Sequence, residues 1–330
     1  MTDKFDIDSL VTEAFKLGGS DIHLLPASPV YYRNNTGDIA ILSRQYINAN
    51  EIKAYFLSIA TDEQLNKNGD IDLAVSIANI RCRINFFYEQ RGLAAVIRLL
   101  ANKPPKMNEI GLPLSVKNLI NKNNGLILFT APTGNGKSTS IAAMLETINQ
   151  TKHKRIITIE DPVEYLYTNK ASIISQREIN RNVVDFANGL HSALREDPDI
   201  IMIGEMRDQE TILAAIAAAE SGHLVFSTLH SADVIQAIDR ITQYFSAKQQ
   251  EIVQSQLSNA FEAIVAQKLI PRKDGQGRIA AFEVLLQTEA TKNIIRTGNT
   301  YTLRSYMTSK DGMQTMDHSI KELKNKGIIF

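Results

Sequence analysis

The chain contains a single cysteine, Cys82, among its 330 residues. One cysteine excludes an internal disulfide framework and a zinc site built from several cysteines, and it is weakly typical of a reducing compartment. The sequence also lacks an excess of charge of either sign, because 36 Lys and Arg balance 36 Asp and Glu. General nucleic-acid-binding proteins carry a surplus of positive charge, so we expect no nucleic-acid partner.

Long apolar runs are missing too. The stretches "ILAAIAAA" and "GLILFTA" fall short of the roughly 20 residues that a membrane-spanning helix needs. The first residues, "MTDKFDIDSL", are acidic and polar, unlike a secretory signal peptide. We therefore expect a soluble cytoplasmic protein.

The pattern of the chain changes after about residue 100. Residues 7–17 carry apolar side chains at helical spacing and end at a pair of glycines, and residues 71–100 predict a three-stranded meander with a turn at "EQRG". The segment "ANKPPKMNEIGLP" follows, and its adjacent prolines fit neither a helix interior nor a central strand. We predict an N-terminal α+β domain, a linker and a C-terminal domain at residues 1–101, 102–113 and 114–330.

Short apolar strands alternate with helices beyond the linker. "LILFT", "RIITIE", "DIIMIGE" and "HLVFST" are strand-like, and helical stretches separate them. This alternation predicts an α/β domain with a mainly parallel sheet. From Ala247 onward we expect a helical tail with one strand near "RIAAFEVLL".

Residues 131–139, "APTGNGKST", nearly match a phosphate-binding P-loop, with Ala131 at the position of the first glycine. In such a loop, backbone N–H groups converge on phosphates at a helix start, the lysine adds a charge and the next hydroxyl ligates Mg²⁺. Alanine fits the first position only if its φ is negative. The alternative is a glycine-rich strand–helix turn. The candidate nucleotide-binding residues are Pro132, Thr133, Gly134, Asn135, Gly136, Lys137, Ser138 and Thr139.

Further polar residues follow the other predicted strands. "TIEDPVEY" places Glu160 and Glu164 after one strand, while Glu205 and His230 follow two others. Open α/β sheets bind ligands at the carboxyl ends of their strands, and a carboxylate there can hold Mg²⁺ or orient an attacking water. Each motif alone also fits a solvated loop or a structural histidine. His223, at the opposite end of its strand, is expected to be structural or part of an interface.

Four ordered segments resemble a known family. "APTGNGKSTSIAAML", "ITIEDPVEY", "ALREDPDIIMIGEMRDQET" and "AAAESGHLVFSTLHSADV" are similar to the Walker A, Asp-box, Walker B and His-box segments of the type II/IV secretion ATPases. The similarity extends to "GGSDIHL", "RCRINFFYEQRG" and "DGMQTMD", so it covers nearly the whole chain. Within this family, the chain resembles the PilT-like pilus-retraction motors and the DotB-like type IV secretion ATPases.

The resemblance implies an architecture, cofactors and partners. The first domain would be PAS-like, and the second would be a RecA-like ATPase domain that uses ATP and Mg²⁺. Subunits would form a homo-hexamer that works with an inner-membrane platform or with secretion-apparatus proteins. The protein would then be cytoplasmic and peripheral to the inner membrane, attached through these partners.

The resemblance also implies roles for the residues at the strand ends. Lys137 would contact the β and γ phosphates, and Ser138 would bind Mg²⁺. Glu205 would support Mg²⁺ partly through water. Glu164 matches the general base of the Asp box, with Glu160 beside it, and His230 would sense the γ phosphate.

Two arginines of the first domain match the family's phosphate-reaching arginines. Arg83 and Arg98 would stabilise the charge that develops on the transferred phosphoryl group, an effect of about 10³- to 10⁵-fold in rate. A solvated strand face is the competing interpretation for Arg83. Arg195 and Arg207, beside the Walker B strand, are weaker candidates for bridging subunits.

Several departures from the family pattern leave the subtype open. Ala131 replaces a glycine, "YYRNNTGDI" differs from the usual stretch, and residues 290–296 match the retraction motif Ala-Ile-Arg-Asn-Leu-Ile only in part. A pilus-retraction motor and a secretion or conjugation motor both remain open. The alternative is a nucleotide-gated assembly scaffold with little turnover. A pilus-assembly motor is excluded because it needs four zinc-binding cysteines, and a DNA-translocating motor is disfavoured by the neutral charge.

Overall fold

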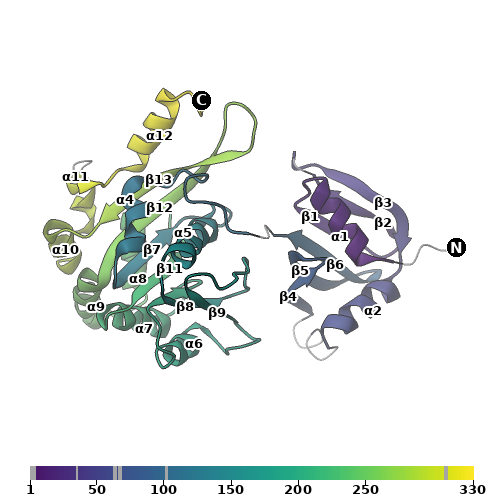
Figure 1. Cartoon of the computed structure of the whole chain (residues 1–330), viewed down its shortest axis with the longest axis horizontal. Helices are drawn as coiled ribbons and strands as arrows, with labels where there is room; N and C mark the ends of the chain where they lie inside the picture. Colours follow the sequence, from purple (N-terminus) through teal and green to yellow (C-terminus); the bar gives the residue numbers. More distant parts are fainter. Residues whose placement is uncertain (1–4, 35, 62–64, 66–68, 101–102, 308–310) are drawn as a thin grey trace. The chain divides into compact units, whose positions relative to one another are not determined.

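The computed structural model describes residues 5–34, 36–61, 65, 69–100, 103–307 and 311–330. The chain divides into two compact units, shown as ribbons in Figure 1. The first unit takes Met1–Lys103 together with the short segment Pro162–Leu166, and the second takes Pro104–Asp161 and Tyr167–Phe330. Each unit is described by itself below.

The first unit is built on a six-stranded antiparallel sheet. Its strand order is β3-β2-β1-β6-β5-β4, and every neighbouring pair is antiparallel. Apolar side chains of α1 and α2 pack with the sheet around Phe56, Ile84 and Phe86. The predicted first helix and meander are confirmed. The elements are α1 (Ile7–Lys16), β1 (Asp21–Leu24), β2 (Ser28–Arg33), β3 (Ile39–Ile47), α2 (Ala49–Ile59), β4 (Asp70–Ile77), β5 (Ile80–Glu89) and β6 (Gly92–Leu99).

The second unit holds a seven-stranded mixed sheet in the order β13-β12-β7-β11-β10-β8-β9. All neighbouring pairs are parallel except β12 with β13. The strands are β7 (Gly125–Thr130), β8 (Arg155–Glu160), β9 (Ile173–Glu178), β10 (Ile200–Ile203), β11 (Leu224–Leu229), β12 (Phe261–Pro271) and β13 (Arg278–Leu286). The helical segments are α4 (Leu114–Asn118), η1 (Leu119–Asn121), α5 (Lys137–Thr151), α6 (Phe186–Ala193), α7 (Gln209–Glu220), α8 (Val234–Gln243), α9 (Ala247–Ala260), α10 (Glu289–Arg296), η2 (Thr300–Thr302), α11 (Leu303–Tyr306) and α12 (Met316–Asn325).

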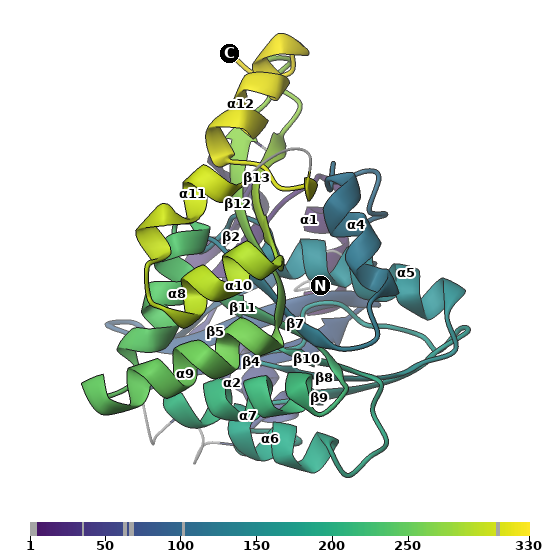
Figure 2. The same ribbon diagram turned by 90° about the vertical axis from the view of Figure 1, so that its left-hand side faces the viewer.

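Helices cover both faces of this sheet, so its central strands are buried throughout. Successive side chains of a strand point to opposite faces, and in β7 Leu128 joins the cluster that contains α7, α8 and α9, whereas Ile127 and Phe129 join the cluster that contains α4 and α5. Figure 2 shows α8 and α9 on one side of β7 and β12, with α4 and α5 on the other. This double cover explains why these strands are continuous apolar runs in the sequence.

The tail of the chain differs from the prediction. Residues 261–271, which we expected to be helical, form β12, an 11-residue strand paired in parallel with β7. Its sequence, "FEAIVAQKLIP", mixes polar and apolar residues without clear alternation because most of it is buried between β7 and β13. The edge strand β9 and the strands β2 and β3 were not predicted either. Within the described residues, no helix is long and apolar enough to cross a membrane.

Candidate functional site

The P-loop connects a fully buried strand, β7, to the start of α5. Gly134 has a φ of +78° and Gly136, the N-cap of α5, a φ of +80°, which are left-handed conformations that favour glycine. Ala131 is buried and is not among the residues with positive φ. The negative φ predicted for residue 131 is therefore confirmed, and alanine causes no backbone strain at the first corner.

Lys137 is buried and folds back over the loop. Its Nζ donates a hydrogen bond to the carbonyl oxygen of Ala131 at 2.7 Å and lies 3.5 Å from Nδ1 of His230. A lysine ammonium only donates, so the imidazole presents its unprotonated Nδ1 to it. The loop thus holds a desolvated positive charge beside the helix N-terminus, an arrangement suited to an anion.

His230 links the P-loop to the end of β10. Its Nε2 lies 3.4 Å from a carboxylate oxygen of Glu205. Burial and the charge of Lys137 lower the pKa of His230 below its ordinary value of 6.5, although Glu205 acts in the opposite direction. The neutral imidazole therefore carries its proton on Nε2, facing Glu205, as the contact with Lys137 requires.

Glu205 is a largely buried carboxylate held at the carboxyl end of β10. Hydroxyls of the neighbouring strand fix this end, since Thr228 Oγ1 donates to the carbonyl of Gly204 at 2.6 Å. Burial opposes ionisation of Glu205, but the hydrogen bond and charge of Arg207, together with the charge of Lys137, outweigh it, so its pKa is lowered. Arg207 also lies 3.6 Å from Asp161. The carboxylate of Glu205 is thus ionised and lies close to His230, which in turn contacts Lys137.

The Asp-box residues fall into different units. Glu160 ends β8 and is buried, and its carboxylate accepts hydrogen bonds from Thr158 Oγ1 at 2.6 Å and Gln176 Nε2 at 3.2 Å. Since β8, β10, β11 and β7 are parallel neighbours, Glu160 lies at the same sheet edge as the P-loop. Glu164 belongs to the segment Pro162–Leu166 of the first unit. Its role as the general base stays a prediction.

The two candidate arginines of the first unit are cross-strand partners. Arg83 on β5 is paired in register with Arg98 on β6, so both side chains project from the same face of the sheet. Each has an acidic partner: Arg83 pairs with Asp72 at 2.8 Å, and Arg98 with the buried Asp21 at 2.9 Å. The sequence did not reveal this pairing, because it depends on strand register.

The remaining candidates have local partners. Nδ1 of His223 lies 3.0 Å from the carbonyl of Ala218 at the end of α7, which supports its structural interpretation. Arg195, two residues past the end of α6, donates to the carbonyl of His191 in that helix at 2.9 Å. This contact does not test a subunit-bridging role for Arg195.

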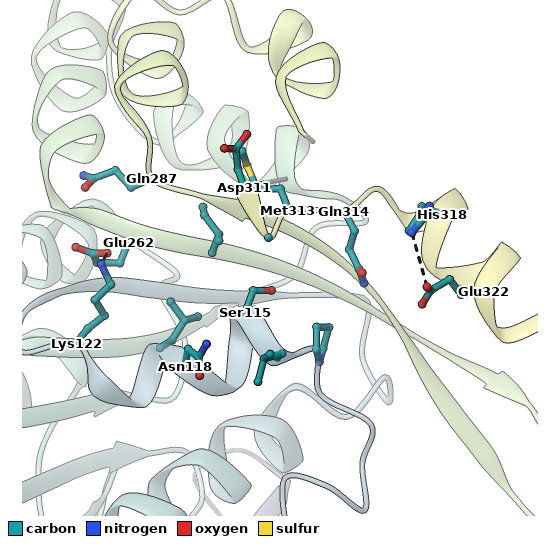
Figure 3. Close-up of a pocket in the computed structure, with 15 residues that line it drawn as sticks. Ser115, Asn118, Lys122, Glu262, Gln287, Asp311, Met313, Gln314, His318 and Glu322 are labelled. Atoms are coloured by element: carbon teal, nitrogen blue, oxygen red, sulfur yellow. Dashed lines mark ion pairs between the residues drawn. The ribbon is translucent and has the colours of Figure 1, made fainter. Parts of the chain in front are cut away.

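A separate cavity of about 630 Å³ lies near the amino-terminal ends of the parallel strands, away from the P-loop. It is lined by α4, the start of β12 and α12 (Figure 3). Its lining includes the ion pair of Lys122 with Glu262 at 2.6 Å and the pair of His318 with Glu322 at 3.9 Å. It contains none of the predicted site residues. The cluster at the P-loop is therefore the better candidate for the functional site.

Sequence comparison places this architecture in a known family. Residues 4–329 match the model of the type II/IV secretion system proteins. The chain belongs to this family. The match spans both units, including the P-loop, the end of β10 and His230.

Individual relatives match over nearly their whole lengths. The chain is 39% identical to the type IV pilus retraction ATPase PilT of Pseudomonas aeruginosa, covering 98% of this chain and 95% of the relative. A crystal structure of the pilus retraction motor PilT with bound ADP superposes with a TM-score of 0.90 at 40% identity, covering 99% and 95% of the two chains. The ATPase DotB of Legionella pneumophila superposes with a TM-score of 0.86 at 27% identity, covering 99% and 94%. The predicted similarity to PilT-like and DotB-like ATPases is therefore confirmed.

Proposed function

We propose that the protein is an ATP-hydrolysing motor that works as a homo-hexamer in a type IV pilus or a type IV secretion or conjugation machine. One observation carries the proposal: the buried Lys137 of the P-loop lies 3.5 Å from His230, which lies 3.4 Å from Glu205. A cation on a helix N-terminus, a histidine and an ionised carboxylate thus meet at the carboxyl edge of a sheet. This arrangement suits a nucleoside triphosphate with Mg²⁺, because the lysine can meet the phosphates and the carboxylate can hold the metal or orient water.

The proposed domain boundaries are those predicted from the sequence. Residues 1–101 form a PAS-like domain, residues 102–113 a linker, and residues 114–330 a RecA-like ATPase domain with a helical tail. The parallel order of β12, β7, β11, β10, β8 and β9 supports the second assignment. The family membership and the PilT and DotB superpositions support the ring assembly, a cytoplasmic location beside the inner membrane and an envelope-machine partner.

The available oxygens fit Mg²⁺. No cluster of three or more His, Cys, Asp or Glu able to hold a metal occurs among the described residues. Mg²⁺ needs no such cluster, because it keeps several waters and binds one or two protein oxygens together with substrate phosphates. Ser138, in the first turn of α5, and the ionised Glu205 supply oxygens of this kind. Bound there, Mg²⁺ would neutralise the charge that develops on the phosphates.

Each of the other candidate residues has its own role in the proposed hydrolysis. Glu164 acts as the general base on the attacking water, with Glu160 held beside the same strand end. His230 reports the γ phosphate to Glu205. Arg83 and Arg98, which share one sheet face, stabilise the transferred group.

The decisive test replaces Lys137. Lys137→Ala should lower phosphate release by at least about 100-fold, because it removes the charge that meets the phosphates. Lys248→Ala, at an exposed lysine of α9, is the matched control and should keep wild-type turnover. Turnover retained by Lys137→Ala would disprove the assignment.

The same assay separates the motor from a nucleotide-gated scaffold. A scaffold would bind ATP without releasing phosphate. The scaffold was suggested by Ala131, and the negative φ and burial of this residue remove that reason. Pilin genes beside this gene would favour retraction, and secretion or conjugation genes would favour the other machine.

A further inference from the structure

The strand that the sequence did not predict contacts the P-loop directly. Gln267 on β12 is only 3% exposed. Its Nε2 donates a hydrogen bond to the carbonyl oxygen of Asn135 at 2.7 Å, and its Oε1 accepts one from Oγ of Ser140 on α5, also at 2.7 Å. One buried side chain thus joins the phosphate loop to the helix that follows it.

The hydrogen bond to Asn135 fixes the direction of the next N–H group. In a trans peptide the C=O and the following N–H point in opposite directions. Because the carbonyl of Asn135 faces Gln267, the N–H of Gly136 faces away from β12. Gly136 is the N-cap of α5, and N–H groups at this position of a P-loop are those that meet a phosphate.

The Asn135 side chain is held from the same strand. The N–H of Leu269 donates to Oδ1 of Asn135 at 3.0 Å, and Nδ2 of Asn135 donates to the carbonyl of Pro132 at 3.1 Å. β12 therefore contacts both the backbone and the side chain of the loop's central residue, and through it the loop entry.

Gly136 packs closely against the side chain of Gln267. A Cβ added to Gly136 would lie 2.9 Å from Nε2 of Gln267, closer than real contacts allow. Both polar ends of Gln267 are satisfied, and a buried polar group that loses its partner carries a large desolvation cost. The loop is thus braced in this conformation by β12 rather than by glycine content alone.

We propose that Gln267 is a positioning residue for the phosphate loop. Through its hydrogen bond to Asn135, it directs the N–H of Gly136 toward the phosphate before nucleotide binds. This inference rests on the proposed function, since it assumes that the loop receives a nucleotide phosphate. In this proposal, β12 holds the phosphate loop in its binding conformation before the nucleotide arrives.

Gln267→Glu tests the proposal with almost no change of shape. The glutamate keeps an acceptor for Ser140 but sets a carboxylate oxygen against the carbonyl of Asn135, so this peptide is driven to turn. We expect the KM for ATP and the Kd for ADP to rise about tenfold or more, as the loss of a preorganised hydrogen bond implies. The kcat should change much less, because ground-state and transition-state binding are weakened together.

Ser140→Ala is the matched control. It removes the other hydrogen bond of the same side chain and leaves the bond to Asn135, so the KM should stay within about twofold of wild type. Gln267→Met, a neutral side chain of similar size, replaces Gln267→Glu if the buried charge prevents folding, and the same rise in KM is expected.

The outcomes separate this inference from the proposed function. Wild-type affinity in a folded Gln267→Glu or Gln267→Met protein would overturn the inference alone. An equal rise in KM for Ser140→Ala would overturn it too, since packing rather than the Asn135 bond would then set affinity. A wild-type protein that binds no nucleotide would overturn the proposed function and this inference together.

Discussion

His230 lies between the Lys137 ammonium and the Glu205 carboxylate, and both charges affect its pKa. Desolvation and the nearby Lys137 ammonium disfavour the imidazolium, while the charge of Glu205 favours it. The net effect keeps the ring neutral at a pH where a free histidine is already partly protonated. The folded protein therefore binds fewer protons at this site than the unfolded chain below pH 6.5, so His230 lowers stability as the pH falls through this region.

The titration of His230 can be measured by side-chain NMR, with His230→Gln used to assign its signal. We expect a midpoint below 6.5 in the wild-type protein. Lys137→Ala should raise the midpoint, because it removes a repulsive charge, and Glu205→Gln should lower it further, because it removes an attractive one. A shift in the reverse direction for either variant would contradict the contacts described for this histidine.

The helix that follows the Walker B strand depends on one capping side chain. Asp208 is the N-cap of α7, and its Oδ1 accepts a hydrogen bond from the N–H of Thr211 at 2.8 Å. Asp208→Ala should lower the free energy of unfolding by about 1 kcal/mol, measured by urea denaturation. Asp208→Asn keeps the acceptor and should keep most of the stability. Glu210→Ala, in the same exposed first turn, is the control, and an equal loss there would argue against the cap.

The elements that could be predicted from the sequence are those whose signal is local. β7 and β11 are apolar at nearly every position, and the P-loop is a contiguous pattern between a strand and a helix. β12 lacked such a signal, because its polar Gln267 and Lys268 interrupt the apolar run. Gln267 was missed for the same reason: its partner Asn135 lies 132 residues away in the chain, and only the pairing of β12 with β7 brings them together.

The cross-strand pair of Arg83 and Arg98 illustrates the same limit within the first unit. The sequence pattern predicted both strands and, from the family resemblance, both arginines. Their pairing, and the buried Asp21 that holds Arg98, depend on the register of β1, β6 and β5. Register follows from the burial of a whole sheet face rather than from any short stretch.

At the scale of the whole assembly, a ring that hydrolyses ATP in concert should be sensitive to inactive subunits. We expect that mixing wild-type protein with Lys137→Ala protein, under conditions that allow subunit exchange, lowers hydrolysis more than in proportion to the inactive fraction. Phosphate release measured across mixing ratios provides the test. A strictly linear decline would mean that each subunit turns over independently, which would contradict concerted hydrolysis in the ring.

The first unit includes Pro162–Leu166, a segment that directly follows the end of β8. Within this unit, Val163 is 5% exposed and its carbonyl accepts a hydrogen bond from Nε of the buried Arg81 at 3.1 Å. A truncated protein that begins at residue 104 would keep the P-loop but leave this valine without its cover. A shortened ATPase unit is therefore expected to expose Val163 next to the end of β8 and to aggregate more readily than the whole chain.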